Sequence, residues 1–154
     1  GSNSPYTALT GVTFTEIENC LIVNAPNLGV NELKTTDVLE LISETSFNWK
    51  GRSDFVINSG GVKIHPEEVE AKIVSLIKLP FFSSSLPDEE LGEKQILCIE
   101  GNIELSKQDL SNQLDSYSIP KEIYLFKKFI YTESNKINRG ETLNQITNAK
   151  KQIL

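Results

Sequence analysis

The chain has 154 residues, 38% of them hydrophobic, with 15 Lys and Arg against 21 Asp and Glu, which gives a formal net charge of −6. This length supports one modest hydrophobic core, or one domain with a piece of a neighbour. The acidic balance, without an extended basic face, argues against nucleic acid as a partner.

Cys20 and Cys98 lie far apart without CxxC spacing, and His65 is the only histidine. We therefore expect no metal site and no disulfide framework, but reduced thiols in a cytoplasmic protein. No long apolar run or signal peptide is present, so no membrane partner is expected. Residues 1–4 resemble a cloning scar, which suggests a chain cut from a longer one.

The first third of the chain predicts short strands. Residues 13–23 roughly alternate between polar and apolar, and residues 38–42 and 45–49 add short β-prone runs. A domain boundary is predicted at residues 51–54. If the preceding strands belong to a larger body, their apolar positions, such as Leu21, Val23, Leu39 and Leu41, should be less well covered than those beyond the boundary.

A hairpin and a helix are predicted next. Two β-prone runs, 55–57 and 62–64, flank Asn58-Ser59-Gly60-Gly61, whose glycines tolerate positive φ. Pro66 then occupies the first position of an amphipathic helix predicted over residues 66–78. The later elements, in chain order, are strands at 81–86 and 95–100 with a polar connection at 87–93, a helix at 105–114 capped by Ser106, a strand at 122–126 and a helical tail at 139–154.

The predicted fold class is α+β, a small mixed sheet with flanking helices, preceded by a short β-rich fragment.

The chain carries Thr35-Thr36-Asp37, Gly51-Arg52-Ser53-Asp54 and residues 132–139 in an order that resembles the adenylate-forming superfamily, which includes acyl-CoA ligases, peptide-synthetase adenylation domains and luciferases. Residues 51–70, from Gly51-Arg52-Ser53-Asp54 to the glutamate-rich helix start, resemble its GRxD signature. Thr35-Thr36-Asp37 resembles its TGD motif, and residues 132–139 resemble its TxSGKxxR motif. The resemblance covers about residues 7–139.

The chain departs from the family pattern at three positions: Thr36 and Asn135 replace usual glycines, and Ile130 stands where proline is common. Because asparagine adopts left-handed dihedrals readily, the change at Asn135 is mild. The change at Thr36 puts the geometry of a turn near the nucleotide in question.

Within the superfamily, residues 5–9, 57–63 and 91–94 look most like o-succinylbenzoate-CoA ligases of menaquinone biosynthesis. The resemblance implies that residues 5–51 end an N-terminal domain, 52–54 form a hinge and 55–154 form the C-terminal lid domain. It implies ATP, Mg²⁺ held mainly by the missing N-terminal domain, and CoA as cosubstrate. The fragment alone is expected to be inactive, and its partner is its own N-terminal domain.

The resemblance also assigns residue roles. Lys136 corresponds to a catalytic cation that stabilises negative charge gathering on oxygens during adenylation. Asp37 corresponds to the carboxylate that binds the ATP ribose, Arg52 to an arginine that contacts ribose or phosphate, and Asp54 to the hinge. From residue type alone these would be a solvated lysine, a turn-forming aspartate, a surface ion pair and a strand-edge aspartate.

Ser59, Gly60 and Gly61 correspond to a turn beside which pantetheine passes, and Tyr117 and Lys121 to residues that meet the CoA nucleotide. A plain hairpin turn, a core tyrosine and a solvated lysine are the alternatives. His65 is assigned no chemistry. The glutamates of the helix start, Glu67, Glu68 and Glu70, are expected to be solvated.

Two rival interpretations remain open. The parent enzyme could act on another aryl or fatty acid, or load a carrier protein in place of CoA. Alternatively, the chain is a non-catalytic interaction module. A second copy of the chain is a further candidate partner, through the exposed β-rich fragment.

Overall fold

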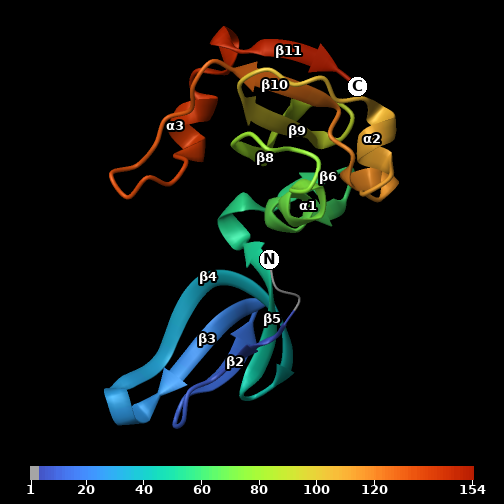
Figure 1. The fold of residues 1–154 in the computed structure, drawn as a ribbon. Helices are drawn as coiled ribbons and strands as arrows, with labels where there is room; N and C mark the ends of the chain where they lie inside the picture. Colours follow the sequence, from blue (N-terminus) through green and yellow to red (C-terminus); the bar gives the residue numbers. More distant parts are fainter. Residues whose placement is uncertain (1–3) are drawn as a thin grey trace. The chain divides into compact units, whose positions relative to one another are not determined.

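The computed structural model describes residues 4–154, so most of the supposed cloning scar, residues 1–3, lies outside the described residues. The chain divides into two compact units, Gly1–Val56 and Ile57–Leu154 (Figure 1). The division therefore comes two residues after the predicted hinge.

The first unit is a single antiparallel sheet. Over the described part of this unit the strand order is β1-β5-β4-β3-β2, and the strands lie side by side in the blue-to-teal part of Figure 1. The strands are β1 (Tyr6–Thr7), β2 (Thr13–Ile17), β3 (Cys20–Ala25), β4 (Val30–Ser43) and β5 (Ser46–Arg52), and two 3-10 helices span Pro26–Leu28 and Ser53–Phe55.

This unit has a small core of its own. Phe14, Leu21, Leu39 and Phe47 are buried together, and the rings of Phe14 and Phe47 meet edge to face at 4.9 Å. Leu21 and Leu39 are 7% and 5% exposed, more than Val69, Ile73 and Ile77 of the second unit at 3%, 0% and 2%, so the expected order of cover is confirmed for these two positions. It also holds for the other two positions named, Val23 and Leu41, which are half-buried.

The second unit is a mixed sheet with helices on both faces. Its path is β11-β10-β9-β6-β7, with β8 also paired to β9. Only β9 and β10 are parallel among the described pairs of this unit. The strands are β6 (Ile57–Ser59), β7 (Val62–Ile64), β8 (Phe81–Asp88), β9 (Gly92–Glu100), β10 (Glu122–Phe126) and β11 (Lys150–Ile153). The helices are α1 (Pro66–Ile73), α2 (Lys107–Ser111) and α3 (Arg139–Leu143), with 3-10 turns at Ser116–Ser118 and Ile146–Asn148.

The central strands are buried on both faces. Leu97 and Ile99 of β9 pack with α1 and α2, whereas Ile96 and Cys98 pack on the opposite face, where Leu143 of α3 covers them. Alternate side chains of a strand point to opposite faces, so this arrangement explains the unbroken apolar run of β9. The α+β fold class predicted from the sequence is confirmed.

Several predicted elements have different bounds. The helix predicted over 66–78 ends at Ile73, although Leu76 and Ile77 still pack on the core. Much of the polar connection at 87–93 belongs to β8 and β9, which form a hairpin. The predicted helical tail is wrong in its last part, since residues 150–153 form β11 beside β10.

Among the described residues, no helix combines the length and the apolar character that a membrane span requires.

Candidate functional site

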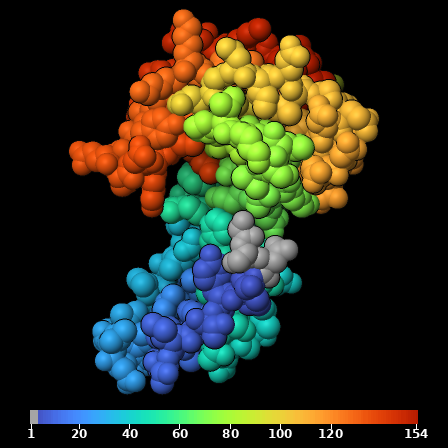
Figure 2. Space-filling model, viewed as in Figure 1, coloured from blue at the N-terminus to red at the C-terminus, as the bar shows by residue number. Residues whose placement is uncertain are grey.

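Lys136 lies on a loop, residues 131–137, that precedes α3 and extends away from the sheet of its unit (Figures 1 and 2). A β-bridge between Tyr131 and Ile137 closes the loop at its base. The N–H of Thr132 donates to the carbonyl oxygen of Lys136 at 2.8 Å, and the N–H of Lys136 donates to Oγ1 of Thr132 at 3.1 Å. These bonds hold the backbone of Lys136, while its side chain is exposed.

Asn135 supplies the turn beside Lys136. Its φ is 60°, in the left-handed region, and its N–H donates to the carbonyl oxygen of Thr132 at 2.9 Å. Because asparagine tolerates this region, it takes the conformation that the usual glycine would supply. The prediction that this departure is mild is consistent with the geometry.

The start of α3 fixes the end of the loop. The N-cap residue Asn138 accepts a hydrogen bond from the N–H of Glu141 at 3.1 Å, and its own N–H donates to Ile130 at 2.8 Å. Oγ1 of the buried Thr142 accepts from the N–H of Ile130 at 3.1 Å. Lys136 is therefore an exposed cation on a loop whose base is hydrogen-bonded on both sides.

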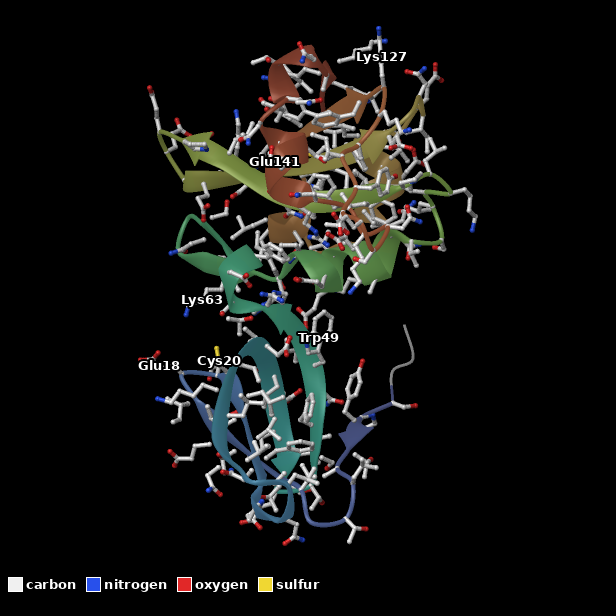
Figure 3. The ribbon with its side chains drawn as sticks, turned by 90° about the vertical axis from the view of Figure 1, so that its left-hand side faces the viewer. Glu18, Cys20, Trp49, Lys63, Lys127 and Glu141 are labelled. Carbon is white, nitrogen blue, oxygen red and sulfur yellow. The ribbon has the colours of Figure 1, made fainter. Side chains whose placement is uncertain are left out.

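Asp37 lies on β4, and Trp49 and Arg52 lie on β5. The indole N–H of Trp49, labelled in Figure 3, donates to Oδ1 of Asp37 at 3.2 Å. Asp37 and Arg52 are direct partners in the β4–β5 register. The structure thus brings together the two predicted nucleotide-binding residues, and it adds a tryptophan that the motifs did not identify.

Beside Trp49 and Asp37 is an open, largely apolar hollow of about 290 Å³, which Tyr6, Leu21 and Phe47 complete. The rings of Tyr6 and Phe47 stack at 5.3 Å. The hollow offers a flat aromatic surface next to a carboxylate.

The guanidinium of Arg52 is paired with Asp54, through Nε at 2.9 Å from Oδ1 and Nη2 at 2.8 Å from Oδ2. The Arg52 hydrogen bonds hold the pKa of the Asp54 carboxyl below its ordinary value. Arg52 also lies over the ring of Phe55 at 5.6 Å. Both members of the pair are exposed, so it contributes little to folding stability.

Gly60 and Gly61 form the turn between β6 and β7. Their φ angles are +58° and +82°, the pattern of a type I′ hairpin turn. The N–H of Gly60 donates to the carbonyl oxygen of Leu91 at 2.8 Å, and Ser59 pairs with Gly92. The predicted hairpin is confirmed, and its turn is joined to the β8–β9 hairpin.

Replacing Gly61 by alanine should reduce the free energy of unfolding by about 1 kcal/mol, because a Cβ there has free space but φ stays positive. Gly60→Ala should cost more, since its Cβ would lie 3.2 Å from Cδ2 of Leu91. Urea denaturation followed by circular dichroism measures both. Gly61→Asn is the control and should recover part of the loss; an unchanged Gly61→Ala variant would contradict the strained turn.

Tyr117 and Lys121 lie between α2 and β10, and both are exposed. The alternative of a core tyrosine is therefore wrong. The hydroxyl of Tyr117 donates to Oδ2 of Asp115 at 3.3 Å, and Lys72 of α1 donates to the same oxygen at 3.1 Å. Tyr117 also borders a shallow polar hollow of about 60 Å³ with Lys63, His65 and Lys72.

The largest departure from expectation among the charged residues is Glu70, which is not solvated. Its carboxylate forms an ion pair with Arg139, 2.8 Å from Nη1 and 2.9 Å from Nη2, and its side chain is only 17% exposed. Burial raises the pKa of Glu70, and the Arg139 charge partly offsets this. Glu70 and Arg139 each lie in a motif, but neither motif indicates that the two meet.

Among the described residues, no group of three or more His, Cys, Asp or Glu side chains is placed to hold a metal ion. Cys20 and Cys98 are free thiols, and burial raises the pKa of Cys98 to about 12.

No family profile matches the chain. It is 28% identical over 123 residues to a putative long chain fatty acid-CoA ligase, VraA, of Staphylococcus epidermidis, with 77% of this chain and 27% of the relative covered. It is 31% identical over 114 residues to an uncharacterized acyl-CoA ligase, YhfT, of Bacillus subtilis, with 71% of this chain and 24% of the relative covered. It is 33% identical over 93 residues to 2-succinylbenzoate-CoA ligase of Lactococcus lactis, with 58% of this chain and 20% of the relative covered.

Two of the solved structures that share the fold are those of acyl-CoA synthetases. One is an acyl-CoA synthetase (AMP-forming)/AMP-acid ligase II-like protein of Dyadobacter fermentans, at 29% identity and a TM-score of 0.59, with 94% of this chain and 44% of that chain covered. The other is o-succinylbenzoate CoA synthetase of Bacillus subtilis in complex with an acyl-adenylate intermediate, at 22% identity and a TM-score of 0.74, covering 95% and 36%.

The chain spans about a quarter of the length of the curated relatives it matches: 27%, 24% and 20% for the three above. Its α+β fold is that of the C-terminal domain of adenylate-forming enzymes. The relatives and structural neighbours of this chain are thus AMP-forming acyl-CoA ligases, o-succinylbenzoate-CoA ligase among them, and the chain matches a part of each.

Proposed function

We propose that this chain is the C-terminal part of an ATP-dependent acid-CoA ligase. Such an enzyme joins a carboxylate to the α-phosphate of ATP with release of pyrophosphate, and then transfers the acyl group to the thiol of CoA with release of AMP. The observation that carries the proposal is Lys136, an exposed cation on a loop whose backbone is held at both ends. The same loop carries the TxSGKxxR-like motif.

Lys136 would act in the first half-reaction. Negative charge gathers on the phosphate oxygens as pyrophosphate leaves, and a fixed ammonium group stabilises that charge. A flexible lysine stem on a projecting loop suits a residue that must reach a neighbouring domain. No carboxylate within the described residues lies in ion-pairing range of its ammonium group, so its charge is not neutralised inside its own unit.

Asp37 and Arg52 would bind the nucleotide. Trp49 donates to Oδ1 of Asp37 and fixes the carboxylate, so that Oδ2 can accept hydrogen bonds from ribose hydroxyls. Arg52 lies opposite Asp37 in the sheet. Its pairing with Asp54 gives it a defined direction before ligand arrives.

Residues 5–51 would then close the N-terminal domain, 52–54 would form the hinge, and 55–154 would form the lid. Asp54 lies in a one-turn 3-10 helix next to the division between the two units, and a pivot at this position would absorb the change in φ and ψ. If the lid rotates about this hinge, the ion pair between Asp54 and Arg52 would have to break and form again.

The thioester half-reaction would use other residues of the lid. The turn at Ser59, Gly60 and Gly61 lacks Cβ atoms at its two central positions, which lets pantetheine pass close to the backbone. Tyr117 would stack on the CoA adenine, and Lys121 would meet a phosphate; both are exposed and able to do so.

For the substrate we propose o-succinylbenzoate in a cytoplasmic pathway to menaquinone, supported by the 2-succinylbenzoate-CoA ligase among the relatives. Mg²⁺ would be held mainly by residues outside this chain. The acyl pocket and the phosphate-binding loop would lie outside it as well.

The longer ligase that contains this chain should convert o-succinylbenzoate, ATP and CoA to acyl-CoA, AMP and pyrophosphate. The assay follows pyrophosphate and thioester separately, with benzoate and a fatty acid as competing substrates and a carrier protein in place of CoA. A preference for a fatty acid or a carrier protein would replace the proposed substrate. Failure to release pyrophosphate with any carboxylate would favour the non-catalytic interaction module.

The isolated chain should release no pyrophosphate and show no measurable heat of ATP binding in calorimetry. The contacts available at Asp37 and Arg52 cannot offset the loss of translational and rotational freedom, roughly 4 kcal/mol or more. Tight ATP binding by the isolated chain would mean that its nucleotide site is more self-contained than proposed.

Sedimentation of the same sample tests whether two copies of the chain associate through the β-rich unit.

A further inference from the structure

The edge of β8 at Ser83 is closed by side chains from two distant segments. Oε1 of Glu70, from α1, accepts a hydrogen bond from the N–H of Ser83 at 2.8 Å. Nη1 of Arg139, from α3, donates to the carbonyl oxygen of the same residue at 3.4 Å. A carboxylate and a guanidinium thus take the place of a neighbouring strand at this position.

The two side chains are also bound to each other by the bidentate ion pair described above, with exposed fractions of 21% for Arg139 and 17% for Glu70. The guanidinium lies 5.5 Å from the ring centre of Phe82. Such a partly buried, forked pair defines one geometry for the arginine, and lysine could not reproduce it.

Arg139 is the first residue of α3 and comes three residues after Lys136. The opposite end of the loop has its own anchor: Glu100 accepts hydrogen bonds from the N–H of Phe129 at 2.7 Å and from the hydroxyl of Tyr131 at 3.0 Å. The loop therefore leaves the sheet at a point fixed by Glu100 and returns at a point fixed by Glu70.

We infer that Glu70 is a positioning residue: through Arg139 and the edge of β8, it sets the direction in which the loop presents Lys136. The inference rests on the proposed function only in that Lys136 is the group being positioned. Glu70 itself touches no reacting atom; it acts through Arg139.

The test measures hydrogen exchange of the loop amides in the full chain. Glu70→Gln keeps the shape of the side chain and an acceptor for Ser83 but removes the charge that holds Arg139. It should speed exchange about tenfold at three hydrogen-bonded amides of the loop, Thr132, Asn135 and Lys136, and at the adjoining N-cap amide of Asn138. The core amides of β9 should keep their rates.

The matched control is Asp115→Asn. It breaks another ion pair that starts on α1, between Lys72 and Asp115, whose members are 49% and 52% exposed. The loop rates should not change in this variant. If Glu70→Gln does not fold, Arg139→Lys replaces it. This variant keeps the positive charge but loses the bidentate contact with Glu70, and it should speed exchange of the same amides by less than the tenfold expected for Glu70→Gln.

Unchanged loop exchange in Glu70→Gln or Arg139→Lys would overturn the inference, and so would equal acceleration of loop and core amides. In the longer ligase, Glu70→Gln should lower kcat of adenylation about tenfold with the KM for ATP nearly unchanged. Faster loop exchange with full adenylation activity would support Glu70 as the residue that fixes the loop but would count against the proposed role of Lys136. Failure of the inference about Glu70 can therefore be told apart from failure of the proposed function.

Discussion

Replacing Lys136 by alanine in the longer ligase should slow adenylate formation about 100- to 1,000-fold, the usual cost of removing one preorganised group that stabilises developing charge. The second half-reaction, capture of a preformed acyl-adenylate by CoA, should keep its rate because no pyrophosphate leaves in that step. Single-turnover assays of each half-reaction, with pyrophosphate and thioester measured separately, give the two rates.

The fold should not change in this variant, because the side chain of Lys136 is exposed and the loop is held by backbone bonds. Lys127, an exposed lysine of the same unit labelled in Figure 3, is the matched control, and Lys127→Ala should leave both rates unchanged. Lys136→Arg keeps the charge and should retain part of the activity. Equal losses in both half-reactions for Lys136→Ala would contradict a lid that uses Lys136 in the first half-reaction only.

The elements that could be predicted from the sequence are those whose residues carry a local signal. The turn at Gly60 and Gly61 follows from two glycines between β-prone runs, and the N-cap at Ser106 from its position before a helical segment; Asp109 completes the capping box. In each case the residues that decide the structure are neighbours in the chain.

Helix α1 shows where periodicity is insufficient. Leu76 and Ile77 keep helical spacing and reach the core, yet the helix ends at Ile73 and continues as a tight turn, with the N–H of Leu76 donating to Ile73 at 2.9 Å. Val74 and Ser75 favour the helix weakly, and Pro80 disfavours helical dihedrals in the residue before it. The apolar face of this segment therefore stays buried after the helix has ended. Its periodicity predicts a longer helix than the one that forms.

The last strand, β11, could not be predicted because nothing local indicates it. Its residues, Lys150–Ile153, are polar apart from the last, and the strand forms because β10 offers an unpaired edge. The pairing of Glu70 with Arg139 is missed for the same reason. A glutamate in the early turns of a helix is usually solvated, and its partner lies 69 residues away.

A second ionic cluster is expected to govern stability. Glu122 of β10 is buried, with Oε1 2.6 Å from Nζ of Lys151 on β11 and 3.0 Å from Nζ of Lys94 on β9. Its Oε2 accepts from the hydroxyl of Tyr124 at 2.8 Å. Burial alone would raise the pKa of Glu122, but the hydrogen bonds from Lys151, Lys94 and Tyr124 outweigh it and lower the pKa to about 2.

Glu122→Gln should therefore reduce the free energy of unfolding by about 2 kcal/mol at pH 7, after allowance for the partly exposed lysines. The folded-state pKa lies below the ordinary value of 4.5, so the contribution is full above pH 4.5 and is lost as pH falls toward 2. Urea denaturation between pH 7 and pH 3 measures the difference between the parent chain and the variant. That difference should be constant above pH 5 and should shrink below pH 4.5.

Two variants separate this cluster from general charge effects. Glu104→Gln removes an exposed carboxylate from the same unit and should leave stability within about 0.5 kcal/mol of the parent at every pH. Lys151→Gln should cost less than Glu122→Gln, because the carboxylate keeps Lys94 and Tyr124 as partners. If the Glu122→Gln difference stayed the same from pH 7 to pH 3, the charge of Glu122 would not be what joins the terminal strand to the sheet.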